Sequence, residues 1–342
     1  MPYDVSALQR LRGANDLRPP LQEGREARRE RRQRESESPE PENGEGEQRL
    51  DKRPRLIVLS AKKGTTDEYG VAARQITRLV DMCWEPRSAI NAGIALLVLD
   101  DDAARVELAT ASTEKKLLYT IFFTLCDLLP GLRDSVDWDD IRSRLDNGKT
   151  AAKTEDNRTF KTQIPKWHTW DPLLSLNKNE RGLQHMECAR LLCPITVDWD
   201  DLEARRRFLI ENVPPQTAEE WPACLYDGKP DPNDLFKGLM RSTLFVNAVR
   251  GVVLPPSVVD AFNSKHAPDH RSNRRTKADT YKIQTVTPGL LAYVAVLLRY
   301  SLSSETIFVD HGGSFSYVHF YNDIAGYLND PQCKDQTKEL ME

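Results

Sequence analysis

Apolar residues recur at helical spacing along most of the chain after residue 68. In residues 69–84 they return every three or four positions, which predicts an amphipathic helix with one buried face. Residues 88–99 are apolar without a clear period. Residues 113–129 and 288–302 are almost continuously apolar, so we predict that both helices lie in the core. A last helix is predicted over about residues 315–328.

A six-residue pattern occurs twice and indicates helix starts. Residues 136–141 read VDWDDI, and residues 197–202 read VDWDDL. With Asp137 or Asp198 at the N-cap, a second aspartate falls in the first turn and the flanking apolar residues form a hydrophobic staple. Paired carboxylates also suit a hard metal cation, but capping explains the whole pattern. Other helix starts are predicted at Thr217, at Asp231 for a helix through Val249, and at Thr287 before Pro288.

The alternation of apolar and polar residues that indicates strands is absent from the chain. The predicted fold class is therefore an all-α or α-dominated globular domain behind a disordered charged N-terminal tail. Residues 146–156 and 265–282 are expected to be the main irregular parts of this domain.

The first 55 residues differ in composition from the rest. Residues 24–34 contain six arginines, and residues 35–47 contain six glutamates and no base. Such a segment cannot bury enough apolar surface to offset the conformational entropy of ordering. We therefore predict a disordered tail over residues 1–55 and a helical domain over residues 56–342. Lys52, Arg53 and Arg55 fit a short nuclear localisation signal, with a solvated linker as the alternative.

The overall composition narrows the class of protein. The 342 residues leave room for a large core, and a formal net charge of −4 argues against a protein whose whole surface coats nucleic acid. Six scattered cysteines are typical of reduced thiols in an intracellular protein. The N-terminus lacks an apolar signal sequence, and no apolar run reaches the roughly 20 residues that span a bilayer. We therefore expect a soluble protein without membrane contact.

Few side chains form a pattern typical of catalysis or metal binding. His185, Cys188 and Cys193 are soft ligands within nine residues, but Cys193 returns only roughly to the helix face of the other two. We therefore predict no metal. Glycine-rich phosphate loops and nucleophile elbows are absent, so no cofactor is expected, and neither cysteine has the local signature of a nucleophile. Trp167 and Trp170 either stack on a nucleobase or, as we prefer, form a packed corner.

The strongest candidate for a binding surface is the basic segment, residues 265–282, in which the only acids are Asp269 and Asp279. Because it connects two apolar helices, we expect it to be exposed. Its bases can contact the phosphates of a nucleic acid or an acidic partner, such as the glutamates of residues 35–47. The alternative is a solvated loop. The predicted binding residues are Lys265, Arg271, Arg274, Arg275, Lys277 and Lys282.

Several motifs in a fixed order resemble a known family. They are RGLQH at residues 181–185, ARLLCP at 189–194 followed by Asp198 and Trp199, WP at 221–222, VTP at 286–288 and FYN at 320–322. Over roughly residues 70–335 the chain resembles an uncharacterised family of basidiomycete fungal proteins defined only as a domain of unknown function. It departs from the family pattern at residues 253–257. The resemblance implies fungal origin and a helical domain, and it carries over no activity and no catalytic residue.

Three functions remain open from the sequence. We favour a non-enzymatic helical interaction module that contacts nucleic acid or an acidic partner through the basic segment and the arginines of residues 24–34, with the nucleus as the predicted location if the signal acts. One alternative is an enzyme with a polar cleft around the RGLQH and DWDD segments. Another is a self-assembling or mobile-element-associated scaffold. The first suspects for the polar cleft are Arg181, His185, Asp198 and Asp200.

Overall fold

The computed structural model describes residues 67–132, 137–228, 234, 237–263, 276–280, 283, 285–308 and 315–341. Over these residues the fold is all-α, as predicted, and the β-type pairing that is described consists of isolated bridges such as those of Pro194 with Pro222 and of Tyr226 with Leu239. Among the same residues, no helix has both the length and the apolar character needed to cross a membrane. The predicted tail lies outside the described residues, and the boundary at residue 56 stays a prediction.

The first described helices are α3 (Glu68–Leu79), α4 (Pro86–Leu97), α5 (Asp101–Thr110) and α6 (Thr113–Leu128). α4 packs closely on α6, since a Cβ atom at Gly93 would lie 2.0 Å from the ring of Phe122. The prediction that α6 lies wholly in the core is wrong, because only one side is buried and Leu117 is 38% exposed. The apolar residues of this segment outnumber its buried positions, so composition overstates its burial.

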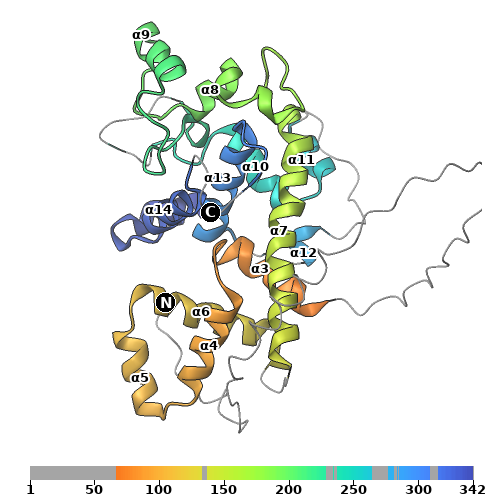
Figure 1. Ribbon diagram of the computed structural model, residues 1–342, viewed down its shortest axis with the longest axis vertical. Coiled ribbons are helices and arrows are strands. Elements are labelled where there is room, and N and C mark those ends of the chain that lie inside the picture. The colour runs from red at the N-terminus through yellow and green to blue at the C-terminus, as the bar shows by residue number, and fades with distance from the viewer. Residues whose placement is uncertain are drawn as a thin grey trace, which may run out of the picture. The chain divides into compact units, whose positions relative to one another are not determined.

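The longest element is α7 (Trp138–Trp167), a helix of 30 residues that runs alongside α3 (Figure 1). Asp137 caps it as predicted, since its carboxylate accepts a hydrogen bond from the backbone N–H of Asp140 at 3.0 Å. Residues 146–156, predicted to be irregular, lie in the middle of this helix. They are polar because one face is exposed, while Gly148, Ala152 and Asp156 follow helical spacing on the buried face.

Short elements make up the middle of the described chain: η2 (Lys178–Glu180), η3 (Gly182–Gln184), α8 (Met186–Leu192), α9 (Leu202–Arg206), the π-helical turn η4 (Arg207–Glu211) and η5 (Ala223–Leu225). α9 begins later than predicted, because Asp201 caps it, while the Asp198 carboxylate accepts a hydrogen bond from the N–H of Asp200. The start predicted at Thr217 is also wrong. No helix follows it, and its hydroxyl bonds to the side chain of Glu219.

The C-terminal elements are α10 (Thr243–Val253), α11 (Pro256–Asn263), α12 (Lys277–Thr280), α13 (Pro288–Leu302), α14 (Tyr317–Asn329), η6 (Pro331–Cys333) and α15 (Lys334–Met341). The helix predicted to begin at Asp231 begins only at Thr243, after the N-cap Ser242. Gly238 and Met240 have positive φ angles of 78° and 56°, which interrupt any right-handed helix before that point.

α13 lies at the centre of the core, as predicted. The hydroxyl of Thr287 caps it by accepting a hydrogen bond from the N–H of Leu290 at 3.1 Å, and every residue from 289 to 302 is buried. A helix without a polar face must be surrounded by other elements, and α3, α7, α10 and α14 pack around it. This packing brings α3, α7 and α13 together at the point where the buried side chains of Arg78 and Asp156 meet.

Candidate functional site

The predicted binding residues fall into two groups. Lys277 is described and is the first residue of α12. The contacts of Lys277 therefore show how the C-terminal end of the basic segment is attached to the domain. The residues that lie outside the described part are Lys265, Arg271, Arg274, Arg275 and Lys282, together with Lys52, Arg53 and Arg55 of the predicted localisation signal.

α12 begins at a reciprocal pair of hydrogen bonds. The backbone N–H of Asp279 donates to the hydroxyl of Thr276 at 2.9 Å, and the carboxylate of Asp279 accepts from the N–H of Thr276 at 2.9 Å. This pair is a capping box, which satisfies N–H groups that a helix start leaves without intrahelical partners. One of the two acids of the basic segment thus fixes a helix start.

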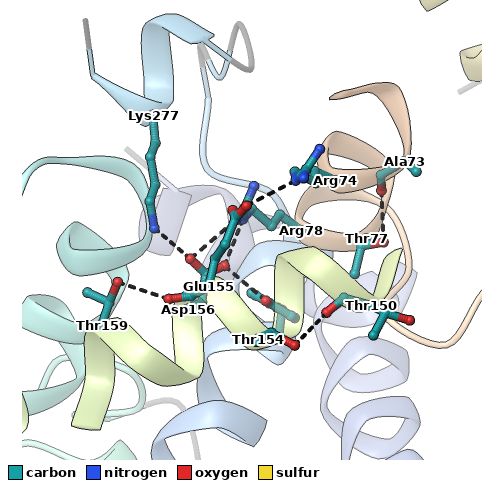
Figure 2. A network of polar contacts seen from close by, with 11 residues as sticks. Ala73, Arg74, Thr77, Arg78, Thr150, Thr154, Glu155, Asp156, Thr159 and Lys277 are labelled. Carbon is teal, nitrogen blue, oxygen red and sulfur yellow. Dashed lines mark hydrogen bonds and ion pairs between the residues drawn. The ribbon is translucent and has the colours of Figure 1, made fainter. Parts of the chain in front are cut away.

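Lys277 reaches from α12 to a buried carboxylate on α7. Its Nζ lies 2.7 Å from Oδ1 of Asp156, whose side chain is fully buried. Asp156 also accepts hydrogen bonds from Nε of Arg78 in α3 at 2.7 Å and from the hydroxyl of Tyr293 in α13 at 2.9 Å. Figure 2 shows Lys277 and Arg78 converging on this carboxylate. Four helices are therefore joined at one buried anion.

A second carboxylate extends the network towards the surface. Glu155, which is 40% exposed, accepts hydrogen bonds from Nη2 of Arg78 at 3.1 Å and from Nε of Arg74 at 3.2 Å. The network, which we call the anchor network, therefore has two carboxylates and three cations: Glu155, Asp156, Arg74, Arg78 and Lys277. Each of the two carboxylates accepts hydrogen bonds from two of these cations.

The electrostatics of the anchor network fit a structural role. Burial, and next the charge of Asp156, raise the pKa of Tyr293 well above its usual range, so its hydroxyl stays protonated and donates. A carboxylate out of water is stable only where partners replace its hydration, and Asp156 has three such partners. Because these donors are already engaged with the carboxylate, the geometry suits an anchor between helices better than a catalytic group.

The helix that precedes the basic segment in the sequence, α11, is also held by the domain. α11 ends at Asn263, and its residue Val259 is buried in the core. Asp260 lies 3.8 Å from Nζ of Lys166 on α7. This exposed ion pair contributes less than about 1 kcal/mol, so the burial of Val259 holds α11 in place. Between the two attachments, residues 264–275 contain four bases and one acid.

The RGLQH motif holds backbone segments together. Arg181 is 1% exposed, and it donates from Nε to the carbonyl of Ser175 at 2.9 Å and from Nη1 to the carbonyl of Ser301 at 2.8 Å. The second contact places a cation at the C-terminal end of α13, where the helix dipole is negative. Gly182 has a φ of 65°, and a Cβ there would lie 3.0 Å from the nitrogen of Ser304. The motif therefore needs glycine at this position.

His185 and the DWDD segment are also used in backbone contacts. Nδ1 of His185 accepts a hydrogen bond from the N–H of Cys188 at 3.3 Å, and Nε2 donates to the carbonyl of Pro172 at 2.9 Å. With both ring nitrogens engaged, His185 has none left for a metal. Four residues are suspected of forming a polar cleft, and three of them hold backbone groups: Arg181, His185 and Asp198. The fourth, Asp200, donates its backbone N–H to the carboxylate of Asp198.

Lys178 is a second cation at the end of α13. Its Nζ donates to the carbonyl of Tyr300 at 2.6 Å and lies 3.2 Å from the centroid of the Tyr300 ring. Burial, and next the charge of Arg181, lower the pKa of Lys178 from 10.5 to about 7. The end of α13 is therefore capped by two cations, of which Lys178 titrates near neutral pH.

The remaining candidates from the sequence are buried. Burial raises the pKa of Cys188 and of Cys193 to about 12, which is opposite to the shift of an activated nucleophile. Trp167 and Trp170 are 4% and 6% exposed, and Nε1 of Trp170 donates to the carbonyl of Ile164, so they form the packed corner we preferred. Within the residues that the structure describes, no group of three or more His, Cys, Asp or Glu side chains is placed to hold a metal ion.

Sequence reasoning misses the anchor network because it treats residues 146–156 as a loop. A signal for the network is present in the sequence. Asp156 stands four residues from Ala152 and four from Phe160, so on a helix all three share one apolar face. A carboxylate on such a face needs a buried cation as its partner, and Arg78 supplies it.

Together these features define an all-α domain whose buried charges hold helices and loops in place. The chain belongs to a family of unknown function, DUF6698, whose sequence model matches residues 147–342, more than half of its length. The motifs predict membership of such a family, although the match begins within α7 and does not reach back to residue 70. Asp156 and Lys277 lie inside the matched region, and Arg78 precedes it. No curated protein and no solved structure matches the chain.

Proposed function

We propose that this protein is a non-enzymatic helical module that binds nucleic acid through the basic segment. The observation that carries the proposal is that the domain holds the described residues on both sides of that segment: Lys277 through its buried pair with Asp156 of α7, and α11 through the burial of Val259. Binding loops are commonly positioned by a rigid scaffold in this way. Lys277 acts as the anchor, and the contacts to phosphate are assigned to Lys265, Arg271, Arg274, Arg275 and Lys282.

The charge distribution supports a local binding surface. The chain has a formal net charge of −4, whereas residues 264–275 alone have a net charge of +3. On a protein of this balance, nucleic acid binds where bases are concentrated, because the phosphate backbone provides most of the sequence-independent affinity. The same field attracts the ligand towards the segment before contact is made.

The contacts of the described side chains favour a binding module over an enzyme. Arg181 and His185 hold backbone carbonyls, and the raised pKa of Cys188 keeps its thiol protonated at neutral pH. A nucleophilic thiol needs a lowered pKa, and the pKa of Cys188 is shifted the other way. The enzyme alternative therefore has less support.

Two further parts of the proposal concern location and source. We infer import into the nucleus through Lys52, Arg53 and Arg55, and origin in a basidiomycete fungus, the second from the order of the family motifs. Replacing the three bases with alanine in a fluorescent fusion is expected to move the protein out of the nucleus. An unchanged distribution would contradict the localisation proposal.

The direct test is binding of the full chain to fluorescent single- and double-stranded DNA and RNA, followed by anisotropy near physiological salt. Replacing Arg271, Arg274 and Arg275 with glutamine is expected to weaken binding at least tenfold, because each phosphate contact contributes to affinity. The matched control replaces Arg87, Arg105 and Arg207, which are exposed and lie outside the basic segment, with glutamine, and it changes the net charge equally. Equal affinity of the wild type and the 271/274/275 variant, or no binding by the wild type, overturns the proposal.

A further inference from the structure

The amine of Lys178 lies against two acceptors at the C-terminal end of α13. Its Nζ donates to the carbonyl of Tyr300 at 2.6 Å and lies 3.2 Å from the centroid of the Tyr300 ring. A carbonyl oxygen and a ring face both accept N–H groups. An amine held in this way directs two N–H groups towards Tyr300. Its remaining tetrahedral position, which a neutral amine fills with its lone pair, therefore points away from both acceptors.

The charges around Lys178 favour a neutral amine over an ammonium ion. Arg181 is a second cation, and its guanidinium donates to the next carbonyl of α13, that of Ser301, at 2.8 Å. Glu305 is the acid whose charge acts on Lys178, and its carboxylate is bound to the hydroxyl of Tyr317. Burial and the charge of Arg181 outweigh that of Glu305, so the pKa of Lys178 falls to about 7.

Lys178 lies in a segment that is open to solvent. Its side chain is half-buried, and the residues on either side of it, Asn177 and Asn179, are exposed. A lysine is activated as a nucleophile when its amine is desolvated or stands beside another cation. Lys178 meets both conditions and stays at the surface of the domain.

We propose that Lys178 is a site of N-acylation, at which an acyl thioester transfers its acyl group to Nζ. The neutral amine attacks the thioester carbonyl, the C–N bond forms as the C–S bond breaks, and the proton of the amine leaves with the sulfur as a thiol. The product is an uncharged amide whose N–H can still donate to the carbonyl of Tyr300. Acylation therefore removes the charge that this site disfavours and keeps a donor at the end of α13.

The test incubates the full chain with acetyl-coenzyme A at pH 7.5, without an added enzyme, and follows each lysine by peptide mass spectrometry. Lys116 is the internal reference, because it is also half-buried and its Nζ donates to the carbonyl of Ala109 at the end of α5, at 3.1 Å. Lys178 is expected to react at least tenfold faster. At this pH about three quarters of an amine with a pKa of about 7 is neutral, against about one part in a thousand for an ordinary lysine. The lower basicity of Lys178 offsets part of this advantage.

The dependence of the rate on pH separates activation from simple access. The rate at Lys178 is expected to level off above about pH 8, where its amine is already neutral, whereas an ordinary lysine still reacts about tenfold faster per pH unit. Glu305→Gln removes the charge that favours the ammonium form. At pH 6.5 this variant is expected to acylate Lys178 about twice as fast as the wild type.

Two results overturn the inference: acylation of Lys178 that is no faster than that of Lys116, or a rate at Lys178 that keeps rising to pH 9. Lys178→Arg identifies the modified peptide, because its acetyl mass shift should disappear. Circular dichroism melting shows whether Glu305→Gln keeps the fold, and the two wild-type readouts decide the matter if it does not. Because no nucleic acid is added, the result is independent of the proposed function.

Discussion

At the scale of single residues, the buried carboxylate of Asp156 connects α7 to α3, α12 and α13. It accepts hydrogen bonds from Arg78, Lys277 and Tyr293, and its side chain is fully buried. Replacing one partner of a buried ion pair leaves the other charge without compensation. The stability of the domain should therefore be more sensitive to this side chain than to the exposed ion pairs.

The first prediction follows from this contact. Asp156→Asn is expected to lower the free energy of unfolding by about 3–5 kcal/mol, since Arg78 then stays buried without its carboxylate. Urea denaturation followed by circular dichroism measures the change. Glu155→Gln, one residue away and 40% exposed, is the control and should cost about 1 kcal/mol or less. Equal losses for the two variants would contradict the role of Asp156.

Lys178 gives the second prediction, which concerns pH. Its pKa falls from 10.5 to about 7 in the folded state, so between these values the unfolded chain binds more protons than the folded one. Keeping a charged Lys178 in this buried place lowers the stability of the fold. This destabilisation is complete below pH 7, and it decreases as the pH rises towards 10.5. Relative to Lys178→Met, the wild type should gain stability between pH 7 and pH 9.5, measured by urea denaturation. If the difference in unfolding free energy between the wild type and Lys178→Met does not change with pH, the lowered pKa of Lys178 is refuted.

At the scale of elements, the contact between α3 and α7 depends on a glycine. A Cβ at Gly148 of α7 would lie 2.7 Å from the carbonyl oxygen of Gly70 and 2.7 Å from the Cβ of Ala73. This close approach positions Arg78 of α3 against Asp156 of α7, two turns further along α7. The helix therefore tolerates a residue of low helix propensity because its packing needs one.

The third prediction uses this glycine. Gly148→Ala is expected to lower the unfolding free energy by about 1–3 kcal/mol, because the clash with α3 outweighs the gain of about 1 kcal/mol in helix propensity. Gly326→Ala in α14 is the matched control, since a Cβ there meets nothing within 4 Å. It should raise the thermal midpoint. An increase for both variants would show that α3 and α7 are not packed this closely.

The same elements show what the sequence can predict. α13 and the cap at Thr287 follow from a continuous apolar run and a preceding threonine, both of which are local signals. The middle of α7 does not follow, because its exposed face and its buried aspartate make it as polar as a loop. The predicted start of α9 is three residues too early, because both Asp198 and Asp201 fit the N-cap pattern and Asp201 is the residue that caps the helix. Of the candidate site, the basic segment is visible in the sequence, and its anchor is not.

At the scale of the whole molecule, the described domain uses its buried charges to hold helices and loops in place, and residues 264–275 are a basic stretch between two of its helices. Arg78, Lys178 and Arg181 hold α7 and α13 from inside the fold. Residues 264–275, with a net charge of +3, lie between two helices that are attached to the domain. If this segment binds phosphates, as we propose, the affinity for nucleic acid falls as the salt concentration rises.

The most direct test is the slope of log affinity against log salt for duplex DNA, measured by anisotropy from about 50 to 200 mM salt. With the five phosphate contacts assigned to the basic segment, the wild type is predicted to show a slope of about −4.5, at about −0.9 per contact. Replacing Arg271, Arg274 and Arg275 with glutamine should make the slope less steep by about 2.7. A flat wild-type slope, or one that the three substitutions leave unchanged, would contradict the claim.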